Sequence, residues 1–284
     1  MALRINYNFE SVSAQRNLSG TQASYAKAIE QLSSGSRINK AADDAAGLAV
    51  SEKLKNQVRG LNQAQRNAQD SISLLQTAEG ALNETHSILA RMRELAVQSS
   101  NDTLTNADRL HIQDEVNQLL SEVDRIAAST QFNTITLLDG NGAVNLKFHV
   151  GANFENNDSA NELSFSLGDA STGGLNITGL ATGNAMSLTS QSTSNAAIST
   201  LDTAIDDIST RRGAIGAMQN RLQSTINSLG VASENTAAAN SRIRDADVAQ
   251  AVSEMTRNQI LQQATMAVLA QANQAPQMAL QLLK

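Results

Sequence analysis

The sequence predicts a mainly α-helical protein, a long antiparallel coiled-coil bundle with a small β-hairpin insert and paired helices at its two ends. Three observations predict this class. Apolar residues recur in steps of four and three along three long segments, one stretch between them alternates apolar and polar residues, and aromatic residues make up only 2% of the chain. Cores without aromatic side chains suit thin helix–helix contacts.

The longest apolar repeat predicts one helix from about residue 45 to residue 99. Steps of four and three from Leu54 to Ala96 meet mostly apolar side chains, and a second stripe from Leu74 to Leu95 widens the apolar face. No proline interrupts this segment. The helix needs partner helices, because a single rod cannot bury its own stripe.

Two further repeats supply those partners. One runs from Ile112 to Ile126 and follows the residues 105–108 (TNAD), which are typical of a helix N-terminus. The other runs from Ile198 to Leu229. The long helix therefore has two predicted neighbours within the same chain.

The stretch 132–193 has a different texture and predicts a β-rich insert. It is rich in Gly, Asn, Ser and Thr, and apolar residues alternate with polar ones in 144–150 and 163–167. The residues 139–142 (DGNG) predict a tight turn.

The two ends of the chain carry narrower apolar stripes than the middle, and we divide the chain accordingly. Residues 1–44 and 240–284 form one predicted terminal domain, and residues 45–239 form a rod-like helical domain. Isolated helices of this kind gain most of their stability from packing, so we expect both ends to order against each other and against other copies. An ordinary intramolecular coiled coil between the ends is the alternative. The stripe residues are Leu18, Tyr25, Ile29, Leu32, Val248, Val252, Met255, Met266 and Leu269.

No pattern in the sequence predicts catalysis, a cofactor or a metal site, so we expect no enzyme. Cysteine is absent, and the histidines at 86, 111 and 149 do not have a metal-ligand spacing. No phosphate-binding loop or nucleophile motif occurs. Asp43 and Asp44 are adjacent carboxylates, which we place at the start of the long helix. Negative charge there is stabilised by the positive end of the helix dipole. Gly35 and Gly47 are consistent with a bend before that helix.

Composition argues against nucleic acid and membrane partners. The net charge is −6 and aromatic residues are few, so neither counterion release nor base stacking is favoured. The stretch 258–283 carries no charge, but repeated Asn and Gln residues interrupt it. We also expect no cleaved export signal of the usual kind, because the N-terminus has no unbroken apolar stretch.

Several long motifs, in order, resemble the bacterial flagellins, the filament subunits of the flagellum. The resemblance covers roughly residues 1–153 and 198–284. Its motifs are AQRNL at 14–18, LSSGSRINKAADDAAGLA at 32–49, NAQDSIS at 67–73, RELAVQ at 93–98, VGAN at 150–153, SRIRDAD at 241–247 and VLAQANQ at 268–274.

The resemblance implies a structural subunit that polymerises with copies of itself into the motility filament. It implies that the terminal segments are disordered in the free subunit and form an inner coiled-coil tube in the filament. It further implies export in unfolded form through the flagellar type III pathway, folding at the growing tip and an extracellular location. The partners implied are an export chaperone, the filament cap and the hook–filament junction proteins. The short middle of the chain indicates that large outer domains are absent.

The resemblance also implies a surface read by the vertebrate Toll-like receptor for flagellin, at Arg91, Leu95 and Glu115. These residues could equally serve contacts between subunits. Two alternatives for the whole chain remain at this point. One is a hook–filament junction protein, which shares the terminal helices, and the other is a non-flagellar coiled-coil surface protein.

Overall fold

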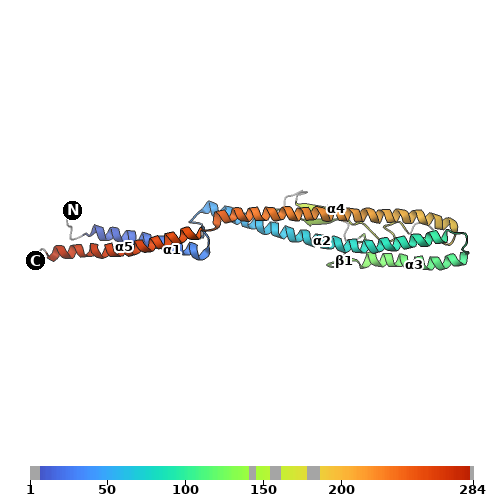
Figure 1. The fold of residues 1–284 in the computed structure, drawn as a ribbon, viewed down its shortest axis with the longest axis horizontal. Coiled ribbons are helices and arrows are strands. Elements are labelled where there is room, and N and C mark those ends of the chain that lie inside the picture. Colours follow the sequence, from blue (N-terminus) through green and yellow to red (C-terminus); the bar gives the residue numbers. More distant parts are fainter. Residues whose placement is uncertain (1–6, 141–144, 154–160, 178–185, 282–284) are drawn as a thin grey trace. The chain divides into compact units, whose positions relative to one another are not determined.

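A computed structural model describes residues 7–140, 145–153, 161–177 and 186–281. Long helices dominate these residues, with short strands between the third and fourth helices, as the sequence predicts (Figure 1). The predicted turn at 139–142 lies largely outside the described residues. The elements are α1 (Phe9–Ser34), α2 (Ala45–Ser99), α3 (Asn106–Ser129), β1 (Gln131–Phe132), β2 (Ile135–Thr136), β3 (Leu146–His149), β4 (Glu162–Phe165), α4 (Gln191–Arg244) and α5 (Val248–Gln281).

Contacts divide the chain into two compact units. Residues 1–56 and 234–284 form one, which we call the terminal unit, and residues 57–233 form the other, the central unit. The division predicted at 44/45 and 239/240 stays a prediction.

The central unit is built on the predicted apolar stripes. Leu75, Leu82 and Leu89 of α2 are fully buried, and so are Leu201 and Leu222 of α4. They belong to one continuous apolar core that also includes α3 and the insert. The periodicity therefore identified the buried faces correctly, since one stripe from each helix meets the others in this core.

Polar contacts fix α2 and α4 as antiparallel neighbours. Ser233 Oγ donates to Asn62 Oδ1 at 2.8 Å, and Gln219 Nε2 donates to Glu79 Oε2 at 2.9 Å. Within this unit, residues near the start of its α2 segment therefore contact residues near the end of its α4 segment.

The start of α3 confirms the predicted cap. Thr105 accepts a hydrogen bond from the Asp108 backbone N–H, and Asp108 accepts one from the Thr105 backbone N–H, a capping box that satisfies two exposed donors. Hydrogen bonds from Thr105 to the Asp108 carboxylate lower the pKa of that group.

Within its described residues, the insert contains two hairpins where the sequence predicts one. Strands β3 and β4 pair antiparallel, with Leu146 opposite Phe165 and His149 opposite Glu162, and lie in the alternating segments. Strands β1 and β2 form an earlier hairpin that the sequence analysis did not resolve. Its turn residues, Asn133 and Thr134, have positive φ angles of 48° and 66°, the geometry that lets a two-residue turn join antiparallel strands.

In the terminal unit, Gly35 ends α1 in the left-handed conformation with φ +66°. The Asp44 carboxylate then accepts a hydrogen bond from Gly47 N at 2.8 Å and so caps α2, as predicted for this acidic pair. Gly47 itself lies inside the first turn of α2 and not in the bend. It is needed there because an added Cβ would lie 2.9 Å from Ile38 Cδ1, as well as clashing with Asp44.

Two connecting segments of the terminal unit are bonded to each other. Arg37 N donates to the carbonyl oxygen of Arg244 at 2.6 Å, and Ala246 N donates to that of Gly35 at 2.9 Å. Arg244 also forms an ion pair with Glu52 at 2.6 Å. The end of α1 and the start of α5 are thus held together by main-chain bonds between segments more than 200 residues apart in sequence.

Candidate assembly surface

Helices α1 and α5 lie side by side and make the predicted pairing of the chain ends (Figure 1). Among the described side chains of these helices, the buried apolar residues are all alanines, which let two helices approach closely but bury little apolar area. They are Ala14, Ala28, Ala251 and Ala272.

Side-chain hydrogen bonds reinforce the pair near the N-terminus of α1. Asn8 caps α1 by accepting a bond from Ser11 N at 3.1 Å, and its Nδ2 donates to the carbonyl oxygen of Ala272 at 2.8 Å. Ser11 Oγ donates to Asn273 Oδ1 at 2.9 Å. Polar contacts with α5 are thus added where the pair buries only alanine.

At the other end of α1, Lys27 Nζ forms an ion pair with the Asp43 carboxylate at 2.8 Å. The Lys27 hydrogen bond, assisted by backbone donors at Lys40 and Asn39, lowers the pKa of Asp43 to about 2. This ion pair links α1 to the turn that precedes α2. Asp43 therefore stabilises the bend, whereas Asp44 stabilises the start of α2.

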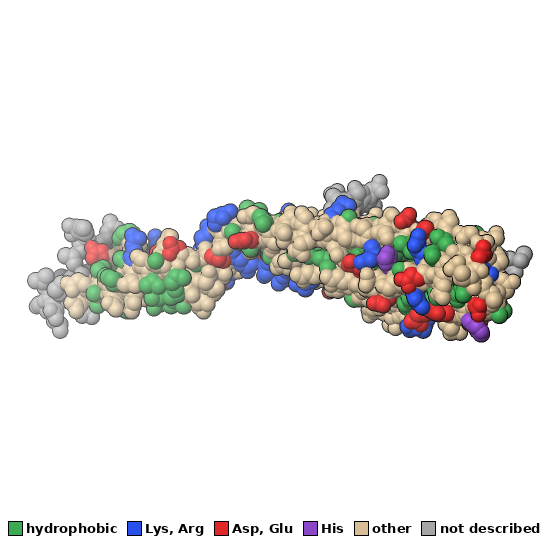
Figure 2. Space-filling view, turned by 45° about the vertical axis from the view of Figure 1, so that its right-hand side comes forward, with side chains coloured by type: hydrophobic (Ala, Val, Ile, Leu, Met, Phe, Trp, Pro, Cys, Tyr) green, Lys and Arg blue, Asp and Glu red, His purple; other side chains and the backbone are tan. Residues whose placement is uncertain are grey.

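Large apolar side chains lie mainly on the outside of the terminal unit. Of the fifteen large apolar side chains that are exposed among the described residues, eleven belong to it. Figure 2 shows the corresponding apolar surface in green over this unit. The eleven are Tyr7, Phe9, Val12, Ile29, Val50, Val248, Val252, Ile260, Leu261, Met266 and Val268.

Helix α5 has apolar residues around its whole circumference. Ala251 and Ala272 face inward, whereas Ile260, Met266 and Val268 are 52–60% exposed. Apolar side chains on several sides of a helix favour packing on several sides, so this surface suits burial by other protein.

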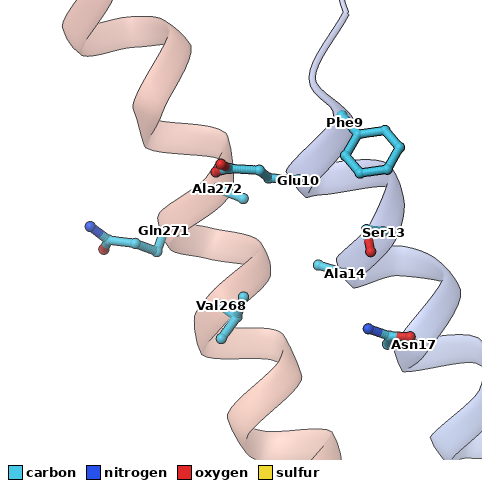
Figure 3. A pocket seen from close by; sticks show the side chains of 8 residues that line it. All are labelled: Phe9, Glu10, Ser13, Ala14, Asn17, Val268, Gln271 and Ala272. Carbon is cyan, nitrogen blue, oxygen red and sulfur yellow. The ribbon is translucent and has the colours of Figure 1, made fainter. Parts of the chain in front are cut away.

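An open groove of about 580 Å³ runs between α1 and α5. Ala14 and Ala272 lie across from each other within it, and the Phe9 ring lies on the side of α1 away from α5 (Figure 3). Small floor residues beside exposed large ones give the knobs and hollows through which helices interlock.

All nine predicted stripe residues lie on α1 or α5, and none is buried. Ile29, Val248, Val252 and Met266 are exposed. The other five, Leu18, Tyr25, Leu32, Met255 and Leu269, are half-buried. Their role in polymerisation stays a prediction.

These helices carry a second set of exposed apolar residues that was not predicted from the sequence. Phe9, Val12, Ile260, Leu261 and Val268 fall outside the predicted stripe, yet all are exposed. The signal for them was present, because apolar residues on several faces of a helix indicate a helix covered on more than one side.

The predicted receptor surface lies on the central unit. Arg91 on α2 donates from Nη2 to Glu115 Oε1 on α3 at 2.9 Å and contacts Glu94 at 3.2 Å, and these carboxylates raise the pKa of Arg91. Leu95 is only 2% exposed and packs in the core. The structure thus brings Arg91 and Glu115 together at the surface, whereas the Leu95 side chain is not available as a surface apolar centre.

The described residues show neither a metal centre nor a membrane segment. Within them, no group of three or more His, Cys, Asp or Glu side chains could hold a metal ion. None of the described helices has a stretch apolar and long enough to cross a bilayer.

Comparison with known families accounts for this arrangement. Residues 5–143 match the bacterial flagellin N-terminal helical region, and residues 198–283 match the bacterial flagellin C-terminal helical region. The chain belongs to the bacterial flagellin family. The matched regions contain both terminal helices and the three long helical segments, so the flagellin pattern includes the terminal unit and most of the central unit.

Flagellin relatives match along their whole length. A flagellin of Halalkalibacterium halodurans is 50% identical over 280 residues, which cover 99% of each chain. The flagellar filament 33 kDa core protein of Treponema phagedenis is 45% identical over 289 residues, again covering 99% of each. The chain is therefore a short-form flagellin and a subunit of the flagellar filament, a structural role. The sequence matches favour this assignment over a hook–filament junction protein and over a non-flagellar coiled-coil surface protein.

A solved structure supports the fold alone. The putative flagellar hook-associated protein from Vibrio parahaemolyticus has a TM-score of 0.56 at 13% sequence identity, covering 72% of this chain and 100% of that one. At this identity the likeness concerns architecture, and the flagellin assignment depends on the sequence matches.

Proposed function

We propose that the exposed apolar surface of the terminal unit is the surface through which copies of this flagellin assemble. The observation that carries the proposal is the concentration of exposed large apolar side chains there, eleven of the fifteen found among the described residues. Contiguous apolar surface of this kind marks a protein interaction site. Burial by identical neighbours removes it from water at about 25 cal/mol per Å².

Ordering of the chain ends accompanies this burial. Fixing a residue's backbone costs about 1–2 kcal/mol, and a pair of helices that buries alanines offsets little of this cost by itself. Neighbouring copies supply the missing apolar contacts. The ends of a free subunit are therefore weakly ordered, and they become the inner coiled coil of the filament only at its growing tip.

A repeated, non-closing contact between different surfaces of identical subunits produces a helical filament. The same weak order of the ends suits export in unfolded form through the flagellar type III pathway, without a cleaved signal and to the outside of the cell. An export chaperone covers the terminal apolar surface before export. The filament cap and hook–filament junction proteins meet it afterwards.

Deletion of residues 265–284 tests the assembly proposal. It removes Met266, Val268 and the Ala272 contact while leaving the central unit untouched. We expect a helical monomer that does not extend filament seeds, read by circular dichroism and electron microscopy. Long filaments from this truncated chain would overturn the proposal.

A full-length pair of variants makes this test sharper. Met266→Gln with Val268→Gln keeps the chain intact but makes its exposed apolar surface polar, and should abolish seeded growth. The matched control, Met266→Leu with Val268→Ile, keeps the surface apolar and should still polymerise. Equal growth by both variants would show that apolar burial at these positions is not required.

We further propose that the surface around Arg91 and Glu115 contacts the vertebrate Toll-like receptor for flagellin in the monomer. Charge-assisted, forked hydrogen bonds from an arginine are strong recognition elements. Because Leu95 is buried, substitution there would act through packing. Arg91→Ala should reduce signalling by receptor-bearing cells, whereas Arg125→Ala, at another exposed ion pair with Glu122, should not. Equal responses to both variants would remove this assignment.

A further inference from the structure

Methionine is the side chain of this protein that is most open to oxidation. The sequence contains no cysteine and no tryptophan, so its seven methionines carry all of the sulfur in the chain. Sulfur side chains are the usual targets of two-electron oxidants such as hydrogen peroxide. The structure describes the side chains of five methionines, which are Met92, Met186, Met218, Met255 and Met266.

Burial divides these five methionines into two groups. Met92 and Met186 are fully buried and Met218 is 8% exposed, and all three belong to the apolar core of the central unit. Met266 is 52% exposed and Met255 is half-buried, and both lie on α5 in the terminal unit. An oxidant in solution must contact the sulfur atom, so it reaches the two methionines of α5 first.

The two methionines of α5 lie on the same side of the helix, within its apolar surface. They are eleven residues apart in sequence, which is about three helical turns. Val252 lies one turn before Met255, and Leu269 lies one turn after Met266. The surface proposed above for assembly therefore contains two thioethers with apolar neighbours.

We propose that Met255 and Met266 are oxidation sites, and that their conversion to methionine sulfoxide blocks assembly through the terminal unit. The inference rests on the assembly function proposed above and adds a redox control to it. The thioether sulfur attacks one oxygen of hydrogen peroxide, so that the S–O bond forms while the O–O bond breaks. The other oxygen leaves with both protons as water. Sulfur is oxidised by two electrons and the peroxide is reduced.

Oxidation changes the property on which burial of this surface depends. A thioether is a weak acceptor and packs as an apolar group, whereas a sulfoxide is polar and accepts hydrogen bonds. The backbone N–H groups within α5 are already used by the helix. Burial of a polar group without a partner weakens an interaction by about tenfold to a hundredfold. An oxidised subunit therefore adds to a filament much less readily.

The block acts on free subunits and spares subunits that are already assembled. Weak order of the chain ends in a free subunit opens both sulfur atoms to solvent, whereas burial by neighbouring copies excludes the oxidant. Oxidant therefore stops growth without dissolving existing filaments. Methionine sulfoxide reductases restore the thioether while two thiols become a disulfide and the oxygen leaves as water, so the block is reversible.

Peroxide-treated subunits and a resistant variant test the proposal. Full-length wild-type monomer is treated with hydrogen peroxide until peptide mass spectrometry shows one added oxygen on Met255 and on Met266. Circular dichroism melts check that the central unit stays folded. The resistant variant, Met255→Leu with Met266→Leu, keeps the apolar volume without the sulfur, since leucine and methionine replace each other well. The matched control, Met218→Leu, removes a thioether from the core instead.

We expect oxidised wild type and oxidised Met218→Leu to extend untreated seeds at least about tenfold more slowly than before treatment, the lower end of the cost of burying a polar group. The resistant variant should grow at its own untreated rate. Reductases for both sulfoxide epimers should return the wild type to its original rate. Undiminished growth by oxidised wild type, no recovery after reduction, or an equal loss in the resistant variant would overturn the inference.

Untreated wild type separates this inference from the proposed function. If it does not extend seeds, the assembly function fails, and the inference fails with it. If it grows and oxidation has no effect, only the inference fails. The mass spectra supply a readout that does not depend on growth, because oxidation of Met92 as fast as that of Met266 would show that burial does not select the sites.

Discussion

Asn8 donates a hydrogen bond from Nδ2 to the carbonyl oxygen of Ala272 at 2.8 Å, and its Oδ1 caps the first turn of α1. One side chain therefore starts the first helix and ties it to the last. Asn8→Ala should remove both bonds and destabilise the pair by about 1–2 kcal/mol, the upper range for loss of a helix cap. Native-state hydrogen exchange of α1 amides measures this local opening. Asn17→Ala, at an exposed position within α1, is the control and should leave the exchange rates as in the wild type.

Gly47 and Gly80 should respond oppositely to alanine. A Cβ at Gly47 would meet Ile38 Cδ1 at 2.9 Å as well as the Asp44 carboxylate, so Gly47→Ala should lower stability by about 1–3 kcal/mol. A Cβ at Gly80 meets nothing within 4 Å, so Gly80→Ala should raise helix stability by up to about 1 kcal/mol. Thermal melts followed by circular dichroism measure both. Melting shifts of the same sign would contradict the close packing at Gly47.

Acid should loosen the start of α2 through Asp43. Its pKa is lowered from 3.8 to about 2, chiefly by the hydrogen bond from Lys27. A group with a depressed folded pKa contributes stability that is fully present above its unfolded value, near pH 4, and is lost as the pH falls through about 2. Asp43→Asn should remove that part of the acid dependence, measured by melting between pH 2 and about 5. An acid dependence that Asp43→Asn leaves as in the wild type would contradict this role of the Asp43 carboxylate.

Arg109 should be the most sensitive charged residue at the turn between α2 and α3. It is 6% exposed and donates to the carbonyl oxygens of Ser99 and Asn101 at 2.9 and 3.1 Å, and to Asn106 at 3.0 Å. Arg109→Met should cost about 3 kcal/mol, because buried carbonyls at the end of α2 lose their donors. Urea unfolding measures the change.

The matched variant is Arg125→Met, at the exposed ion pair with Glu122. It should change the unfolding free energy by less than about 1 kcal/mol, as is usual for a surface pair. Similar losses from the two substitutions would show that burial of the Arg109 guanidinium does not set the cost.

Regular periodicity explains what could be predicted from sequence. The expected helix from about 45 to 99 coincides with α2, because its apolar stripe, the carboxylate at Asp44 and the absence of proline all indicate the same element. The cap at Thr105 was equally visible, since its short motif acts locally. These features depend on neighbours in sequence.

Features that no regular pattern or short motif specifies escaped prediction. Arg109 looks like an ordinary surface cation in sequence, and only the fold closes carbonyl oxygens around it. The β1–β2 hairpin turns at Asn133 and Thr134, and threonine with a positive φ is uncommon enough that no turn was expected. Leu95 lies on the predicted apolar stripe of α2, which correctly indicates a buried side chain. Its assignment to the receptor surface implied an exposed one.

The main-chain bonds between residues 35–37 and 243–246 have a consequence for the order of events during folding. The first helix cannot obtain its partners until almost the whole polypeptide is present, whichever end emerges first. A product that stops early lacks the second half of this junction as well as α5. Completion of the terminal unit therefore requires a chain that continues through residues 243–246 into α5.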